Sequence, residues 1–157
     1  MQQVVFLFFY DTFINHFSLG FYMKIRKASK SDAKACLQVF KLDKEKYWKL
    51  KDFEDAAAHK DSIFLVAEED NKVVGYVIGY IVPTRKIEAA LHETRVDKRE
   101  RGKHIGAKLV DAFCREAFRR GVKSVFALIE PELAGFYCTK CKFRKTGKWI
   151  EVTKIEK

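Results

Sequence analysis

The chain of 157 residues is long enough to form one domain with a hydrophobic core. Apolar residues make up 48% of the sequence, which excludes a disordered chain. Its 31 Lys and Arg residues against 21 Asp and Glu residues give a formal charge of +10, which favours anionic partners. The basic residues are spread over the whole chain, so a solvated, charged surface accounts for most of the excess.

Residues 1–22 differ from the rest of the chain by their high apolar and aromatic content. The run Val4–Tyr10 has no basic region before it and no small-residue cleavage site after it, unlike a signal peptide. Asp11, Asn15 and His16 interrupt the apolar stretch that begins with this run, so the stretch is too short for a membrane span, and we expect no membrane partner. Two interpretations are open: an extension from a misplaced start codon, or an apolar flap that covers the domain or a second copy of it in a homodimer.

From residue 23 onward, segments with the hydrophobic period of a strand alternate with segments that have the period of a helix. We therefore expect 1–22 to be an N-terminal extension and 23–157 to be one domain. In chain order the pattern predicts a strand at 24–27, a helix from Ser29 or Ser31 to Phe40, a helix near 51–59, a hairpin over 63–82, a strand at 87–96, a helix over 104–120, a strand at 122–128, a helix at 132–140 and a closing strand at 149–155. The strand–helix–strand crossover through 86–128 indicates an α/β fold with a mixed sheet.

The four cysteines favour structural roles. Cys36 and Cys114 lie in helical patterns and are expected in the core. Cys138 and Cys141 form one Cys-x-x-Cys, but zinc requires two more ligands at a matching spacing and the sequence has no second pair. We therefore expect no metal, and this cysteine usage is typical of a cytoplasmic protein.

The segment Val96–Leu109 combines a strand end, a basic loop with two glycines and the start of an apolar-faced helix. The first amides of a helix have no intrahelical acceptor, and the helix dipole adds partial positive charge there. Gly102 and Gly106 let the backbone approach a bulky anion, so the loop suits a phosphate or pyrophosphate. An ordinary strand–turn–helix connection with solvated charges explains the same pattern.

The run Arg101–Gly106 after a strand, followed further along by Phe136-Tyr137 and Phe143, resembles the GNAT superfamily of N-acetyltransferases. The resemblance covers residues 23–155, and the predicted order of strands and helices is also that family's order. It implies the GNAT-like acyl-CoA acyltransferase fold, with a central mixed sheet of roughly six to seven strands and about four helices. It further implies transfer of an acetyl group from acetyl-CoA to a primary amine by direct attack on the thioester.

In that family the loop wraps the pyrophosphate of acetyl-coenzyme A, and the strand before it pairs with the pantetheine arm where the sheet splays open. The resemblance therefore implies a cofactor site made of Arg95, Val96, Arg101, Gly102, Lys103, His104, Ile105, Gly106, Ala107 and Glu130. His104 stands where the family usually has glycine, and its backbone N–H can still donate provided that its φ is negative, which a helix N-terminus permits. Glu130 stands where the family often has Asn. One residue more than usual separates Tyr137 from Phe143, and the usual glycine before Phe143 is missing.

Two side chains are the candidate catalytic residues. Glu93 lies three residues before Val96, where many family members carry an acid, and simple alternation puts it on the same strand face as Leu91. It is the candidate base, acting directly or through water, although a salt-bridge role explains it as well. Glu88 and His92 are the reserve candidates. Tyr137 is the candidate acid for the departing thiolate, because its ordinary pKa of ~10 suits that transfer.

The acceptor is not determined by these patterns. In the family the acceptor pocket is lined by the segment after the first helix and by the C-terminal strands, here residues 41–60 and the surroundings of Trp149. Lysines in 41–60 indicate an acidic acceptor or simply a solvated helix face. The alternative to an enzyme is a module of the same fold that binds coenzyme A without catalysis, or RNA or the ribosome through its basic surface; for the enzyme we do not expect a nucleic-acid partner.

Overall fold

The computed structural model describes residues 23–42, 47–83 and 87–147. The expected extension at 1–22, the closing strand at 149–155 and Trp149 lie outside the described residues. The strands are β1 (Lys24–Lys27), β2 (Ser62–Glu69), β3 (Lys72–Ile81), β4 (Glu88–Val96) and β5 (Ser124–Phe126). The α-helices are α1 (Ala33–Lys41), α2 (Leu50–Ala58) and α3 (Ile105–Arg119), and the shorter helical segments are η1 (Lys30–Asp32), η2 (Lys98–Glu100), η3 (Pro131–Leu133) and η4 (Gly135–Lys140). In this part of the chain no helix combines the length and apolarity needed to cross a bilayer.

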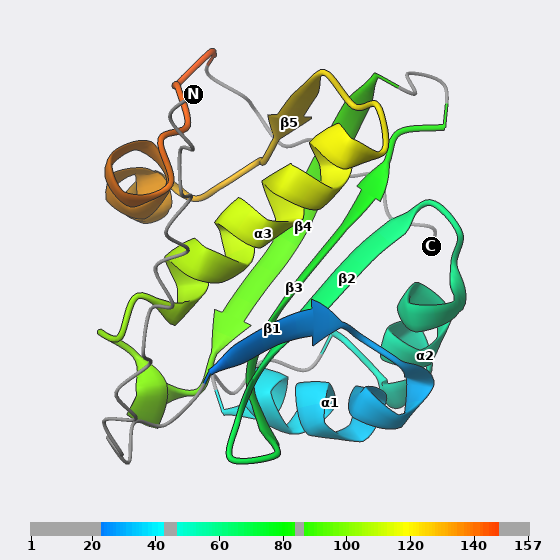
Figure 1. Cartoon of the computed structure of the whole chain (residues 1–157). Helices are drawn as coiled ribbons and strands as arrows, with labels where there is room; N and C mark the ends of the chain where they lie inside the picture. The colour runs from blue at the N-terminus through cyan, green and yellow to red at the C-terminus, as the bar shows by residue number, and fades with distance from the viewer. Residues whose placement is uncertain (1–22, 43–46, 84–86, 148–157) are drawn as a thin grey trace, which may run out of the picture.

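The five described strands form one sheet in the order β1-β2-β3-β4-β5. All neighbours are antiparallel except β4 and β5, which run parallel because α3 connects them (Figure 1). The hairpin of β2 and β3 turns at Asp70 and Asn71, whose φ values of 50° and 60° suit a tight hairpin turn. The predicted mixed α/β sheet with its crossover is therefore confirmed.

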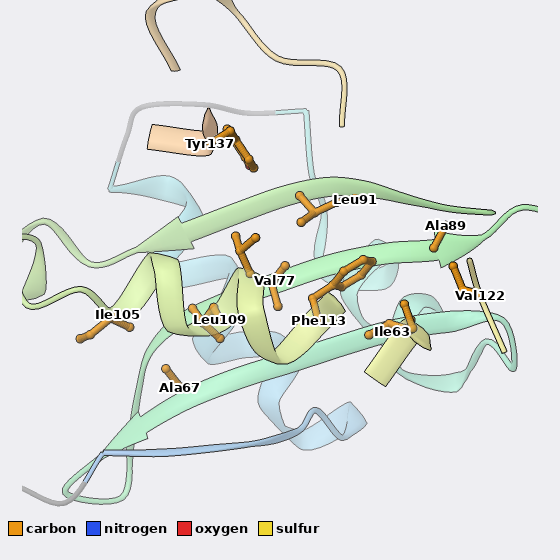
Figure 2. Packing of buried hydrophobic residues seen from close by; sticks show 12 residues of the cluster. Ile63, Ala67, Val77, Ala89, Leu91, Ile105, Leu109, Phe113, Val122 and Tyr137 are labelled. Atoms are coloured by element: carbon orange, nitrogen blue, oxygen red, sulfur yellow. The ribbon is translucent and has the colours of Figure 1, made fainter. Parts of the chain in front are cut away.

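Each face of the sheet carries its own hydrophobic cluster. The first is mostly aliphatic and packs Leu109 and Phe113 of α3 on Val77 and Leu91, with Tyr137 among its buried members (Figure 2). The second is rich in aromatic rings and packs α1 and α2 on the opposite face; its largest members are Phe40, Phe53, Phe64 and Tyr76. The sheet thus separates an α3 face from an α1–α2 face.

A β-bulge in β4 changes which face its later residues occupy. Ile78 pairs with Glu93, whereas the next residue of β3, Gly79, pairs with Leu91, so His92 is an extra residue. Directly paired residues lie on the same face. Glu93 therefore lies with Ile78 on the α1–α2 face, and the expectation that it shares a face with Leu91 is wrong.

The segment after α3 differs from the predicted strand and helix. Strand β5 has three residues instead of the seven expected over 122–128, because it pairs with β4 only over Glu88–Ala90. The single helix expected over 132–140 is divided into the 3-10 turn η3 and the π-helix η4. In η4 the Cys141 N–H donates to the Phe136 carbonyl five residues earlier, at 3.1 Å. A π-turn accommodates one extra residue. The spacing from Tyr137 to Phe143 is also one residue longer than the family pattern, and the π-turn accounts for this difference.

Candidate active site

A basic loop leaves the end of β4 and leads into α3. Asp97 fixes its start, because its N–H donates to the Val74 carbonyl at 2.8 Å and its buried carboxylate accepts from Arg99 N at 3.0 Å and Arg99 Nη2 at 2.7 Å. The Arg99 guanidinium holds the pKa of the Asp97 carboxyl below its usual range. These contacts turn the Arg99 side chain back onto the loop.

The N-terminus of α3 presents backbone amides beyond this loop. Lys108 N–H donates to the His104 carbonyl at 3.1 Å, and the amides of Ile105, Gly106 and Ala107 precede this first intrahelical bond. Gly102 has a φ of +87°, and apart from its chain neighbours no heavy atom of the described residues lies within 4 Å of the place where its Cβ would be. Open backbone and converging amides suit a phosphate group, as the sequence predicts.

His104 has a left-handed backbone, with φ of 61° and ψ of 13°. The condition of a negative φ is therefore not met. A Cβ in this conformation crowds the following carbonyl, which costs roughly 1–2 kcal/mol and which glycine avoids. Lys142, which precedes Phe143, also has a left-handed φ of 63°. Both positions where this chain lacks the family's glycine are thus positions that favour glycine physically.

The basic side chains of the loop already have partners within the chain. Arg101 Nε donates to the Val96 carbonyl at 3.1 Å, and Lys103 Nζ pairs with Glu100 and lies 3.9 Å from Glu69 Oε2. Glu100 also raises the pKa of the Lys103 ammonium. An incoming anion would therefore share these cations with the protein.

Gly106 makes room for an aromatic ring. Its Cβ would lie 3.3 Å from Phe136 Cζ and 3.6 Å from a Val96 methyl carbon. The first turn of α3 can lie this close to the Phe136 ring because Gly106 carries only a hydrogen in place of a side chain. The sequence predicts a glycine here for the close approach of a phosphate. The packing against Phe136 is a second reason for it.

The edge of β4 opens toward β5. The two strands pair at Glu88–Ser124, Ala89–Val125 and Ala90–Phe126, and β5 does not accompany β4 beyond Ala90. The splayed sheet that the resemblance implies is therefore present at the stretch that ends at Val96. Glu93 and Thr94 both lie within this stretch.

Glu93 belongs to a polar group on the α1–α2 face. It is 8% exposed, and its Oε1 accepts a hydrogen bond from Arg95 Nε and one from the Tyr47 hydroxyl at 3.5 Å. Arg95 Nη2 also donates to the Tyr47 hydroxyl at 3.2 Å, and the guanidinium carbon lies 5.6 Å from the centre of the Phe40 ring. Glu93 thus takes part in a salt bridge, and its partner Arg95 lies two residues further along the same strand and not on a neighbouring strand.

Tyr137 lies on the α3 face, in the π-helix η4. Its side chain packs edge-on against Phe136 and Phe143, with ring centres 5.0 and 5.6 Å away, and the residue is only 7% exposed. Burial raises the pKa of its hydroxyl, and the neighbouring Thr94 hydroxyl acts in the opposite direction. Thr94 Oγ1 is itself buried and makes no hydrogen bond of ordinary length and angle to the described residues. The Tyr137 phenol is therefore kept protonated beside the open edge of β4.

The other predicted residues lie further from this group. Glu88 begins β4, in the part that pairs with β5, and His92 is exposed with its ring 5.5 Å from that of Tyr80. Glu130 is exposed at the start of η3 and its side chain makes no capping bond. The structure brings together Glu93 and Arg95 on one face of β4, and Tyr137 against the other.

Three groups at the site were missed from the sequence. Thr94 adjoins Tyr137, Asp97 anchors the loop, and the Arg95 side chain holds Glu93, although only its backbone was expected to act. Alternation within β4 pairs Glu93 with Arg95 on one face and signals their contact. No sequence pattern signals the bulge at His92.

The chain matches the model of the acetyltransferase (GNAT) family over residues 32–143. No curated protein is significantly similar to it in sequence. Among solved structures, AAC(6')-Iy with a bisubstrate analogue is 18% identical over 85% of this chain and 99% of its own, with a TM-score of 0.75. An aminoglycoside acetyltransferase from an uncultured soil metagenomic sample is also 18% identical, over 86% and 97%, with a TM-score of 0.73. Glucosamine-6-phosphate N-acetyltransferase from Arabidopsis thaliana is 26% identical over 85% and 98%, with a TM-score of 0.63. The chain belongs to the GNAT family of acetyltransferases.

Proposed function

We propose that the chain transfers the acetyl group of acetyl-CoA to a primary amine, by direct attack of the amine on the thioester. The opening of the sheet beside β4 is the observation that carries this proposal. Glu93 lies on one face of the open stretch and Tyr137 packs against the other. A thioester in this opening has a carboxylate on one side and a protonated phenol on the other.

The residues at the end of β4 fit the donor. The amides of Ile105–Ala107 and the open backbone of Gly102 suit the pyrophosphate. The edge of β4 between Ala90 and Val96, from which β5 diverges, suits the amide groups of the pantetheine arm. Arg101 and Lys103 supply positive charge beside both.

The chemistry assigned to the side chains consists of two proton transfers, one from the amine and one to the departing thiolate. Glu93 takes the proton from the amine, directly or through water, as the C–N bond forms and the C–S bond breaks. Tyr137 gives its phenolic proton to the sulfur. Because burial raises the pKa of Tyr137, the phenol stays protonated until the thiolate departs.

The first experiment combines calorimetry with acetyl-CoA and an assay of thiol release. Glu93→Gln should lower kcat by about 100-fold or more and leave the dissociation constant of acetyl-CoA unchanged. Glu88→Gln is the matched control, since it removes a carboxylate from the same strand outside the open stretch, and it should retain activity. Wild-type kcat in Glu93→Gln would contradict the assigned base. Failure of acetyl-CoA to bind at millimolar concentration would leave the non-catalytic module as the better hypothesis.

Amino sugars are the first acceptors to assay. The names of the solved structures above include aminoglycosides and glucosamine 6-phosphate, which are a polycationic and a phosphorylated amine. These two classes differ in charge, so a comparison between them also tests the acceptor side of the site.

A further inference from the structure

A hollow of about 420 Å³ adjoins the polar group around Glu93. It is lined by Tyr47, Trp48, Asp52, Asp55 and Tyr80. Tyr47 belongs to both places, because its hydroxyl donates to Glu93 Oε1 at 3.5 Å while its side chain lines the hollow. A molecule in the hollow therefore lies against Tyr47, whose hydroxyl bonds to the candidate base.

The charge of this lining is negative. Asp52 and Asp55 lie one helical turn apart on α2 and face the same way. Their charges help to raise the pKa of the Tyr80 hydroxyl, after burial of that residue, so both carboxylates lie close to the ring. Asp55 pairs with Lys51 at 3.1 Å, a contact exposed to solvent, and Asp52 accepts from the Lys49 backbone N–H at 2.6 Å.

The aromatic walls are held by neighbouring rings. Trp48 packs on the core residue Phe53, with ring centres 5.0 Å apart. Tyr80 lies edge-on between His59 and His92, with centres 5.7 and 5.5 Å away. Anchored aromatic rings beside carboxylates attract cations, because the face of each ring is negative.

We propose that the acceptor carries a second ammonium group and that this hollow binds it, while the first amine reaches Glu93. The proposal rests on the proposed acetyl transfer and names its acceptor class: a diamine, a polyamine or a polycationic amino sugar. Trp48, Tyr80, Asp52 and Asp55 select this class by charge and by contact with the aromatic rings.

The same lining argues against an acidic acceptor. The lysines of 41–60 were one reason to expect such an acceptor, but none of those within the described residues lines the hollow. Those that the structure describes, Lys41, Lys49, Lys51 and Lys60, are exposed. A phosphorylated amine would bring its negative charge close to two carboxylates, which is unfavourable.

Two measurements test the proposal: thiol release with butane-, pentane- and hexane-diamine against the monoamines of equal length, and calorimetric binding of the same amines. The double variant Asp52→Asn with Asp55→Asn should raise the KM for the best diamine by about 10-fold or more and leave the KM values for monoamine and acetyl-CoA unchanged. Glu54→Gln is the matched control, since it removes one charge from α2 without altering the hollow. Asn keeps an oxygen that can accept the Lys49 N–H, so the start of α2 is preserved.

Equal kcat/KM for diamines and monoamines in the wild type would overturn the proposal, as would diamine binding in the double variant equal to that in Glu54→Gln. Weaker diamine binding in the double variant would support the hollow even if no amine released thiol. Thiol release is thus the test of acetyl transfer, and binding is the independent test of the hollow.

Discussion

The two faces of the sheet differ in chemistry and in how they are assembled. The α3 face is aliphatic, ends in a loop with exposed amides, and draws its phosphate-binding features from the continuous stretch 96–109. The α1–α2 face is aromatic and carries the buried contact of Glu93 with Arg95, joined by Tyr47 from a distant segment. In the function proposed above, the donor binds from one side of β4 and the acceptor from the other. Substitutions on the two faces should then change different kinetic constants.

The largest expected effect is on the stability of the α3 face. A Cβ on Gly79 would lie 2.5 Å from Phe113 Cζ and closer still to the Ala90 carbonyl oxygen. Gly79→Ala should lower the free energy of unfolding by about 3 kcal/mol, because a buried ring and a strand must both move. Denaturant unfolding measures this change. Gly135→Ala should stay within about 0.5 kcal/mol of wild type, because beyond the neighbouring backbone no atom in the described part of the chain lies within 4 Å of the new Cβ.

Removing the Tyr137 hydroxyl tests whether the α3 face also supplies a proton. Tyr137→Phe should lower kcat by about 100-fold and leave acetyl-CoA binding unchanged. Because burial raises the pKa of Tyr137, its proton persists as the pH rises beyond the ordinary value of ~10, so wild-type kcat should not fall on the alkaline side until above that pH. Steady-state rates measured across pH check both statements. A phenylalanine variant with wild-type kcat would remove Tyr137 from the mechanism.

On the α1–α2 face, Arg95 is expected to act as a positioning residue for Glu93. Arg95→Gln should lower kcat by roughly 10-fold and raise the acceptor KM, since Glu93 and Tyr47 lose the guanidinium that holds them. The KM for acetyl-CoA should not change, and Arg95→Lys should recover part of the loss. If acetyl-CoA binding weakened as much as acceptor binding, the division between the faces would not hold for this residue.

The smallest expected effect concerns the two left-handed residues. His104→Gly and Lys142→Gly should each raise the free energy of unfolding by up to about 1 kcal/mol, because glycine relieves the crowding of the Cβ at positive φ. Lys103→Gly, beside His104 but without a positive φ, should lower it instead. Thermal or denaturant unfolding distinguishes these outcomes. A loss of stability in both glycine variants would mean that their side chains contribute more than the strain costs.

The sequence predicted the α3 face more completely than the other, for a physical reason. Hydrophobic period, glycines and basic residues within one stretch indicate a strand, a loop and a helix N-terminus, because these features depend on near neighbours. The hairpin turn at Asp70 and Asn71 and the helix from Ile105 were predicted for the same reason.

The polar group of the α1–α2 face depends on contacts between residues far apart in the chain. Tyr47 and Glu93 are 46 positions apart, and their contact needs α1, α2 and the sheet to be in place. The π-helix η4 is accompanied by the packing of Tyr137 against Phe143, a contact that the helical period of 132–140 does not specify. Short-range periodicity carries no information about either feature.

The bulge at His92 changes which residues of β4, the odd-numbered or the even-numbered ones, lie on the α3 face. Before it, the odd-numbered residues Ala89 and Leu91 belong to the α3 cluster; after it, the even-numbered Thr94 and Val96 lie on that side and Glu93 and Arg95 on the other. If His92 were instead paired with Ile78 in a regular ladder, every residue that follows would lie on the opposite face of the sheet. The bulged pairing of this strand, as much as the identity of its residues, therefore determines on which side of the sheet the proposed base Glu93 lies.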